Sequence, residues 1–287
     1  MAPPSPPLRR FFSARDGLRL SALEWPGPPG GDRLPLLCLP GVARTALDFL
    51  EVGGRHAETR RVVALDYAGH GESERAADPG RYRVEVALRD LLDAMAALRL
   101  DRVVLLGTSF GGILAMSLGV LRPGCLAAVA MNDVGPRIEP AGLVVVREVI
   151  GRDPAFADYD EATAFLRRTL PPLATDEAGW RSVAEKTYVR GEDGRLHPRW
   201  DTRIVEALRA EDPGATELWP LFGALAHVPL LLFWGQESKL LTASTVARMR
   251  EARPDMAVAG LPGIGHAPRL VEPLAVAAFD RFLSAQP

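Results

Sequence analysis

The sequence predicts an α/β protein with a mostly parallel sheet, helices on both faces and a helical insertion. Short apolar segments such as 34–39 and 102–106 alternate with stretches in which apolar residues recur at helical spacing. This alternation is typical of parallel strands covered by helices. It stops between residues 135 and 225 and resumes with the apolar segment 229–234. The intervening stretch is therefore predicted to be an insertion over one edge of the sheet.

The core elements can be predicted in chain order. Segments 11–13 and 18–25 flank a turn at Arg15-Asp16-Gly17, which predicts an opening hairpin. Continuous apolar character then predicts buried strands. These strands are expected at 34–39, 61–66, 102–106, 126–131, 229–234 and 256–261. Apolar residues at helical spacing predict the core helices, which are expected at 82–98, 113–121 and 274–283.

Three parts of the chain follow from this pattern. Residues 1–10 are rich in proline and lack the apolar centre of a secretory signal, so they are predicted to be a flexible tail. Residues 11–134 and 226–287 are predicted to form the α/β core. Residues 135–225 are charged, helical in pattern and rich in aromatic side chains, and they are predicted to form a cap.

Composition narrows the possible partners. The 287 residues include 34 basic and 36 acidic side chains, a net charge of -2, with no long run of one sign. Nothing therefore indicates binding to nucleic acid or to a membrane. Cys38 and Cys125 are predicted to be reduced core thiols of a cytoplasmic protein, although one disulfide is conceivable. No cysteine and histidine cluster has metal-ligand spacing, so neither a metal nor another cofactor is expected.

The most informative motif is Gly107-Thr108-Ser109-Phe110-Gly111, which matches G-x-S-x-G. It lies between a predicted strand and a predicted helix, the context in which such a serine sits on a tight turn with its hydroxyl exposed. Flanking glycines leave room for the turn. The helix that follows directs backbone N–H groups and its positive end toward a developing oxyanion. Ser109 is therefore the predicted nucleophile.

Four motifs in order carry a resemblance to a known family. They are Pro40-Gly41, Asp66-Tyr67-Ala68-Gly69-His70-Gly71-Glu72-Ser73, the motif around Ser109, and Gly265-His266-Ala267-Pro268. Over nearly the whole chain the sequence resembles the α/β-hydrolase superfamily, in its capped serine esterase and carbon–carbon hydrolase branch. The resemblance implies an eight-stranded, mostly parallel sheet with a helical cap. Asp66 is interpreted as the residue that organises its turn.

The resemblance assigns the general base to His266, which follows the last predicted strand and precedes the last helix. The other histidines have simpler interpretations. His56 is expected on an exposed helix, His70 in the turn motif, His197 in the cap and His227 in a connecting segment. By position, the backbone N–H groups of Val42 and Phe110 would form the oxyanion hole.

Two further residues are expected near the oxyanion loop. The glycine of the Pro40-Gly41 pair lets this loop approach the substrate closely, and Arg44 follows the loop. Gly41 and Arg44 are therefore candidate substrate-binding residues. Arg44 is a candidate partner for a substrate carboxylate, and a solvated loop arginine is an equal alternative.

The triad acid departs from the family pattern. Most relatives place it after the seventh strand, where this chain has Gly235-Gln236-Glu237-Ser238-Lys239 and no aspartate. Asp133 ends the strand that follows the nucleophile's helix, as the acid does in certain lipases and haloalkane dehalogenases. Asp133 is therefore the predicted acid, with Glu237 in reserve. The alternative is that Asp133 caps a turn.

These residues together predict a serine hydrolase that cleaves a carboxylic ester of a small or medium-sized molecule through an acyl-enzyme. A serine nucleophile argues against dehalogenase and epoxide hydrolase chemistry. A carbon–carbon (meta-cleavage product) hydrolase, a lactonase and an acyltransferase or perhydrolase remain alternatives. A small-ligand binding protein is the non-enzymatic alternative. The sequence does not predict the oligomeric state.

Overall fold

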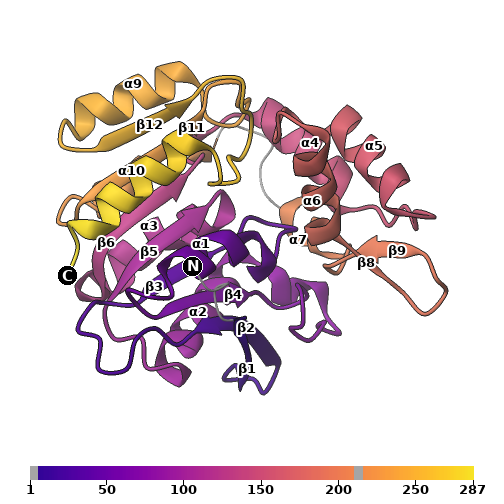
Figure 1. Cartoon of the computed structure of the whole chain (residues 1–287), viewed down its shortest axis with the longest axis horizontal. Coiled ribbons are helices and arrows are strands. Elements are labelled where there is room, and N and C mark those ends of the chain that lie inside the picture. The colour runs from indigo at the N-terminus through magenta and orange to yellow at the C-terminus, as the bar shows by residue number, and fades with distance from the viewer. Residues whose placement is uncertain (1–5, 210–215) are drawn as a thin grey trace.

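The computed structural model describes residues 6–209 and 216–287. Within them, eight strands form one sheet in the order β1-β2-β4-β3-β5-β6-β11-β12 (Figure 1). Strand β2 runs antiparallel to β1 and β4, and every other pair in this sheet is parallel. The strands are β1 (Leu8–Ser13), β2 (Arg19–Trp25), β3 (Leu36–Leu39), β4 (Val62–Asp66), β5 (Val103–Thr108), β6 (Leu126–Asn132), β11 (Leu230–Gly235) and β12 (Ala257–Leu261). The predicted fold class is thus confirmed.

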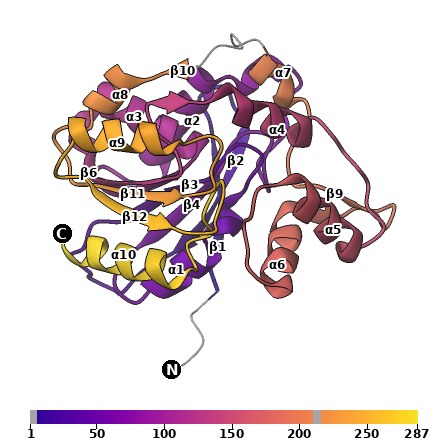
Figure 2. The ribbon, with the colours of Figure 1, turned by 90° about the horizontal axis from the view of Figure 1, so that it is seen from above.

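Helices cover both faces of this sheet because side chains along each central strand alternate between two apolar layers. In β3, Leu37 and Leu39 belong to one buried cluster, and Leu36 and Cys38 belong to the other. Figure 2 shows the two layers on opposite sides of the strands. One layer holds α2 (Val84–Ala97), α3 (Phe110–Leu121), α8 (Trp219–Gly223) and α9 (Ala243–Ala252), and the other holds α1 (Leu50–His56) and α10 (Pro273–Ser284).

The segment between β6 and β11 extends beyond the sheet and has a small core of its own (Figures 1 and 2). Besides α8, which packs on the sheet, its helices are α4 (Pro140–Ile150), α5 (Tyr159–Thr169), α6 (Glu177–Thr187) and α7 (Ile204–Arg209). It also contains two short strand pairs, which the helical pattern did not predict. These are β7 (Arg137–Ile138) with β10 (Thr216–Glu217), and β8 (Tyr188–Arg190) with β9 (Leu196–Pro198). Phe222 and Leu225 join the sheet's own apolar layer, although the predicted cap extended to residue 225.

The N-terminal prediction needs a correction. Residues 1–5 of the predicted tail lie outside the described residues, whereas residues 8–10 belong to β1 and pair with β2. The strand therefore begins three residues before the position expected from sequence. The missed residues are Leu8, Arg9 and Arg10, and two arginines beside a leucine that is 46 % exposed gave no apolar signal at this edge of the sheet.

The prediction for His56 is wrong. Its ring is buried at the end of α1, edge-on to Phe279 with 5.5 Å between the ring centroids. Its Nε2 lies 3.4 Å from Oδ1 of Asp280. Burial lowers the pKa of His56 to about 4, despite the opposing charge of Asp280. The reason is that α10 packs over α1, and a contact between helices so far apart in sequence leaves no local pattern.

Cys38 and Cys125 are separate buried thiols, and burial raises the pKa of both. Among the described residues, no helix is both long and apolar enough to cross a membrane. The same part of the chain holds no group of three or more histidine, cysteine, aspartate or glutamate side chains suited to a metal ion.

Candidate active site

Ser109 occupies a tight turn between β5 and α3. Its backbone has φ +49° and ψ -111°, a region that residues other than glycine rarely adopt. The flanking glycines are required by space. A Cβ at Gly107 would lie 2.5 Å from the carbonyl oxygen of Gly111, and one at Gly111 would lie 2.2 Å from that of Leu39. The predicted turn is therefore present, and it leaves Ser109 half-buried at the lining of a cavity.

The loop after β12 brings His266 to this turn. Nε2 of His266 lies 3.0 Å from Oγ of Ser109, and Nδ1 lies 2.7 Å from Oδ2 of Asp133. The three side chains come from segments far apart in sequence, and they form one chain of hydrogen-bond contacts. Because Asp133 accepts at Nδ1, the neutral ring has Nε2 available to accept the proton of the hydroxyl.

Asp133 follows the last residue of β6 and is fully buried. Its second oxygen, Oδ1, accepts a hydrogen bond from the backbone N–H of Gly235 at 2.9 Å. Strand β6 pairs directly with β11, so an acid at the end of β6 can reach the place that family members fill from the end of β11. Glu237 is exposed in the turn after β11, and no side-chain contact links it to His266. The structure thus places Asp133, not Glu237, at the imidazole.

The backbone N–H groups of Val42 and Phe110 are both available. Among the described residues, none accepts a hydrogen bond from either group. Phe110 is the first residue of α3, where helix N–H groups have no partner within the helix. Val42 lies in a loop that packs on Ser109, because a Cβ at Gly41 would be 3.5 Å from the Cβ of Ser109. Both groups therefore suit an oxyanion beside the nucleophile.

Two cavities meet at the nucleophile. The first, the cap-side cavity, has a volume of about 160 Å³ and lies between the loop after β3, the loop after β12 and the segment 146–200. The second, the helix-side cavity, has a volume of about 290 Å³ and lies over α3. Ser109 and His266 line both cavities. A carbonyl bound at Ser109 would therefore have one substituent in each.

Arg44 lines the cap-side cavity, but its charge is already engaged. Its Nε donates a hydrogen bond to Oδ2 of Asp48 at 2.7 Å, and its guanidinium also contacts Thr187. Sequence analysis did not single out Arg269, which lines the same cavity three residues after His266. Its nearness to the histidine motif was the only local signal that could have drawn attention to it.

A serine on a strand-to-helix turn above a mostly parallel sheet is the arrangement of the α/β hydrolases. The model of the alpha/beta hydrolase family matches residues 36–279, and the chain belongs to this family. It is similar to a 3-hydroxybutyrate-oligomer hydrolase from Cupriavidus necator, with 32% identity over 93% of each chain. It is also similar to a 2-hydroxymuconate semialdehyde hydrolase from a Pseudomonas species, with 39% identity over 83% of this chain and 84% of that one.

Among solved structures, the chain is similar to an alpha/beta hydrolase from Novosphingobium aromaticivorans. The TM-score is 0.91, with 36% identity over 98% of this chain and 99% of the other. Fold, family and relatives agree, and the protein is a hydrolase of the α/β family.

Proposed function

We propose that this chain hydrolyses a carboxylic ester of a small or medium-sized molecule through an acyl-enzyme on Ser109. The observation that carries the proposal is the contact chain from Ser109 Oγ through His266 to Asp133, with distances of 3.0 and 2.7 Å. His266 takes the hydroxyl proton while Oγ attacks the ester carbonyl carbon. Asp133 holds the ring in the correct tautomer and stabilises the imidazolium that forms.

The charge that develops on the carbonyl oxygen is stabilised by the N–H groups of Val42 and Phe110, each contributing about 3 kcal/mol. The carbon–oxygen bond then breaks, and the leaving alcohol takes the proton from His266. Water, deprotonated by His266, attacks the acyl carbon and releases the acid. Ser109 recovers its proton, so every proton transfer uses residues of this chain.

The ester bond is favoured by the relative that is 32% identical and named a 3-hydroxybutyrate-oligomer hydrolase. Hydroxy acids form oligomers through ester bonds. The helix-side cavity is lined mostly by apolar side chains such as Ile113, Leu218 and Leu221, which suits a short acyl or alkyl group.

Stopped-flow hydrolysis of 4-nitrophenyl butyrate tests the proposal. The wild type should release a burst of about one nitrophenol per chain before steady turnover, because nitrophenol is a good leaving group and the acyl-enzyme forms faster than water hydrolyses it. Ser109→Ala should abolish the burst, whereas Ser284→Ala, at an exposed serine near the C-terminus, should keep it. Unchanged release by Ser109→Ala would refute the proposal.

A carbon–carbon hydrolase is the second candidate, because a relative at 39% identity is named a 2-hydroxymuconate semialdehyde hydrolase. The same serine, histidine and aspartate could act on a vinylogous diketone. A panel of butyrate esters, lactones and ring-fission dienoates separates the candidates by kcat/KM. A strong preference for the dienoates would replace the ester proposal. The binding-protein alternative was supported only by the missing acid after the seventh strand. The contact of Asp133 with His266 removes that support.

A further inference from the structure

The two cavities that meet at Ser109 differ in charge. The described residues that line the cap-side cavity include three cationic side chains and one carboxylate, Asp48. Two of the cations are neutralised. Arg44 pairs with Asp48, and Nζ of Lys186 lies 2.6 Å from Oε2 of Glu51. The third cation is Arg269.

The guanidinium of Arg269 makes no hydrogen bond and no ion pair within the described part of the chain. The backbone N–H of Arg269 does have a partner, since it donates to Oε1 of Glu272 at 3.1 Å. Asp176, the N-cap of α6, also lies beside Gly179; its Oδ1 accepts from the N–H of Gly179 at 2.7 Å, and it forms no ion pair with Arg269. The side chain is half-buried. Within the described residues, its charge therefore lacks both a protein partner and full exposure to water.

The position of the guanidinium is fixed by α6. A Cβ at Gly179 would lie 2.7 Å from Nη1 of Arg269, so the glycine makes room for it. Val183 and Lys186 follow Gly179 by four and seven residues, which places all three on one face of the helix. Val183 and Lys186 line the cap-side cavity. Because Gly179 is one helical turn from Val183, the guanidinium that lies beside Gly179 is at the same cavity wall.

Among the described residues that line the helix-side cavity, no cationic side chain is free to pair with a carboxylate. Arg137 pairs with Glu139 at 2.9 Å and with Glu217 at 2.6 Å, and Arg147 is already partnered. An exposed carboxylate, Glu85, also lines this cavity and forms no ion pair with any described residue. An anionic group would be repelled there and attracted to the opposite side of Ser109.

We propose that the site selects esters with a free carboxylate on one side of the scissile carbonyl, bound by Arg269 in the cap-side cavity, and an apolar group on the other. This inference rests on the proposed ester hydrolysis and names its substrate class. A guanidinium presents two parallel N–H donors that match the two oxygens of a carboxylate. Lysine has the same charge but cannot present two parallel N–H donors.

Two pairs of esters test the inference and locate the carboxylate. The mono-4-nitrophenyl ester of glutaric acid and its methylated counterpart differ by one charge on the acyl side. Butyryl glycolate and its methyl ester differ by one charge on the alcohol side. In one pair the wild type should prefer the anion in kcat/KM, and Arg269→Gln should lower that preference about 10- to 100-fold. The kcat/KM for the neutral ester should stay within about twofold.

Matched variants separate charge recognition from stability. Arg269→Lys should keep part of the preference, and Arg167→Gln, which removes an exposed arginine paired with Glu177 on the cap, should keep all of it. An equal loss for charged and neutral esters, or no preference in either wild-type pair, would overturn the inference and leave ester hydrolysis standing.

Binding gives a readout that does not depend on turnover. Calorimetry with Ser109→Ala and glutarate monobutyl ester should show an affinity that falls at least about 10-fold when Arg269→Gln is added. Equal affinity for the two proteins would overturn the inference even where esters are not turned over. Absence of any Ser109-dependent hydrolysis of 4-nitrophenyl butyrate would instead contradict the proposed function.

Discussion

Two buried imidazoles should make the protein lose stability in mild acid. Burial lowers the pKa of both His56 and His70 to about 4. In His70, Nδ1 donates to the carbonyl oxygen of Ala68 at 2.9 Å and Nε2 accepts from the N–H of Ala43 at 3.3 Å. Protonation would set a second N–H against that of Ala43, so the fold holds the ring neutral.

Proton linkage gives the sign and size of this effect on the free energy of unfolding. In the unfolded chain both rings take a proton below their ordinary pKa of 6.5, whereas the folded protein excludes it down to about pH 4. The stabilisation is therefore present above pH 6.5 and is lost as the pH falls toward 4. A shift of this size corresponds to about 3 kcal/mol per ring in full, and to about 2 kcal/mol per ring at pH 5.

Urea unfolding at pH 7.5 and pH 5.0 measures the effect. The substitution His56→Phe removes one titrating ring and keeps an aromatic contact with Phe279. The loss of unfolding free energy between the two pH values should be about 2 kcal/mol smaller in this variant than in the wild type. Other titrating groups are shared and cancel in the difference. His227→Gln, at an exposed ring, should lose as much unfolding free energy between the two pH values as the wild type does. A loss in His56→Phe as large as that of the wild type would refute the reasoning.

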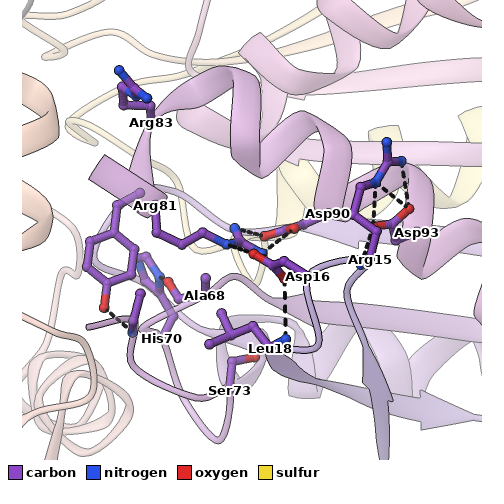
Figure 3. A network of polar contacts seen from close by, with 12 residues as sticks. Arg15, Asp16, Leu18, Ala68, His70, Ser73, Arg81, Arg83, Asp90 and Asp93 are labelled. Carbon is purple, nitrogen blue, oxygen red and sulfur yellow. Dashed lines mark hydrogen bonds and ion pairs between the residues drawn. The ribbon is translucent and has the colours of Figure 1, made fainter. Parts of the chain in front are cut away.

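Three other substitutions, one of them with a matched control, have defined outcomes. Asp133→Asn should lower kcat about 10³- to 10⁴-fold by favouring the wrong tautomer, while Glu237→Gln stays within about twofold, and a reversed order in steady-state assays would exclude Asp133 as the acid. Arg81→Met should lose about 3 kcal/mol in urea unfolding, because it strands the buried carboxylate of Asp90 that it pairs with in Figure 3. Gly111→Ala should lose about 3 kcal/mol or more, because its methyl would meet a carbonyl oxygen of β3. Wild-type stability in either variant would contradict these steric and charge arguments.

Sequence predicted the sheet well because its central strands are short, continuous apolar segments, and the observed bounds of all eight strands lie within three residues of the expected ones. The placement of the acid also followed from sequence. Neighbouring parallel strands end at the same edge of a sheet. Asp133, after β6, could therefore be expected beside the turn after β11, where the family's usual aspartate is missing. The contact of Asp133 with His266 agrees with this reasoning.

Contacts between distant segments could not be predicted in the same way. The role of Arg269 depends on α6, because Gly179 lies 90 residues earlier in the chain and nothing in either local pattern indicates their contact. His56 shows the same limit, since its burial depends on α10. The short strand pairs around α7 have only two or three residues each, too few for an alternating pattern to stand out.

The turn around Asp66 links several parts of the site. Its carboxylate accepts from the N–H of Ala46 at 2.8 Å, just after the oxyanion loop, while His70 accepts from Ala43 within that loop. The same turn holds the returning end of the insertion, since the N–H of Gly71 donates to the carbonyl oxygen of Arg199 at 2.7 Å. One turn therefore fixes both the loop that presents the N–H of Val42 and the chain that closes the cap-side cavity. Two of these contacts run from the side chains of Asp66 and His70 to backbone N–H groups, and the third joins two backbone groups, so the turn connects the loop that carries the proposed oxyanion donor Val42 to the insertion by direct hydrogen bonds.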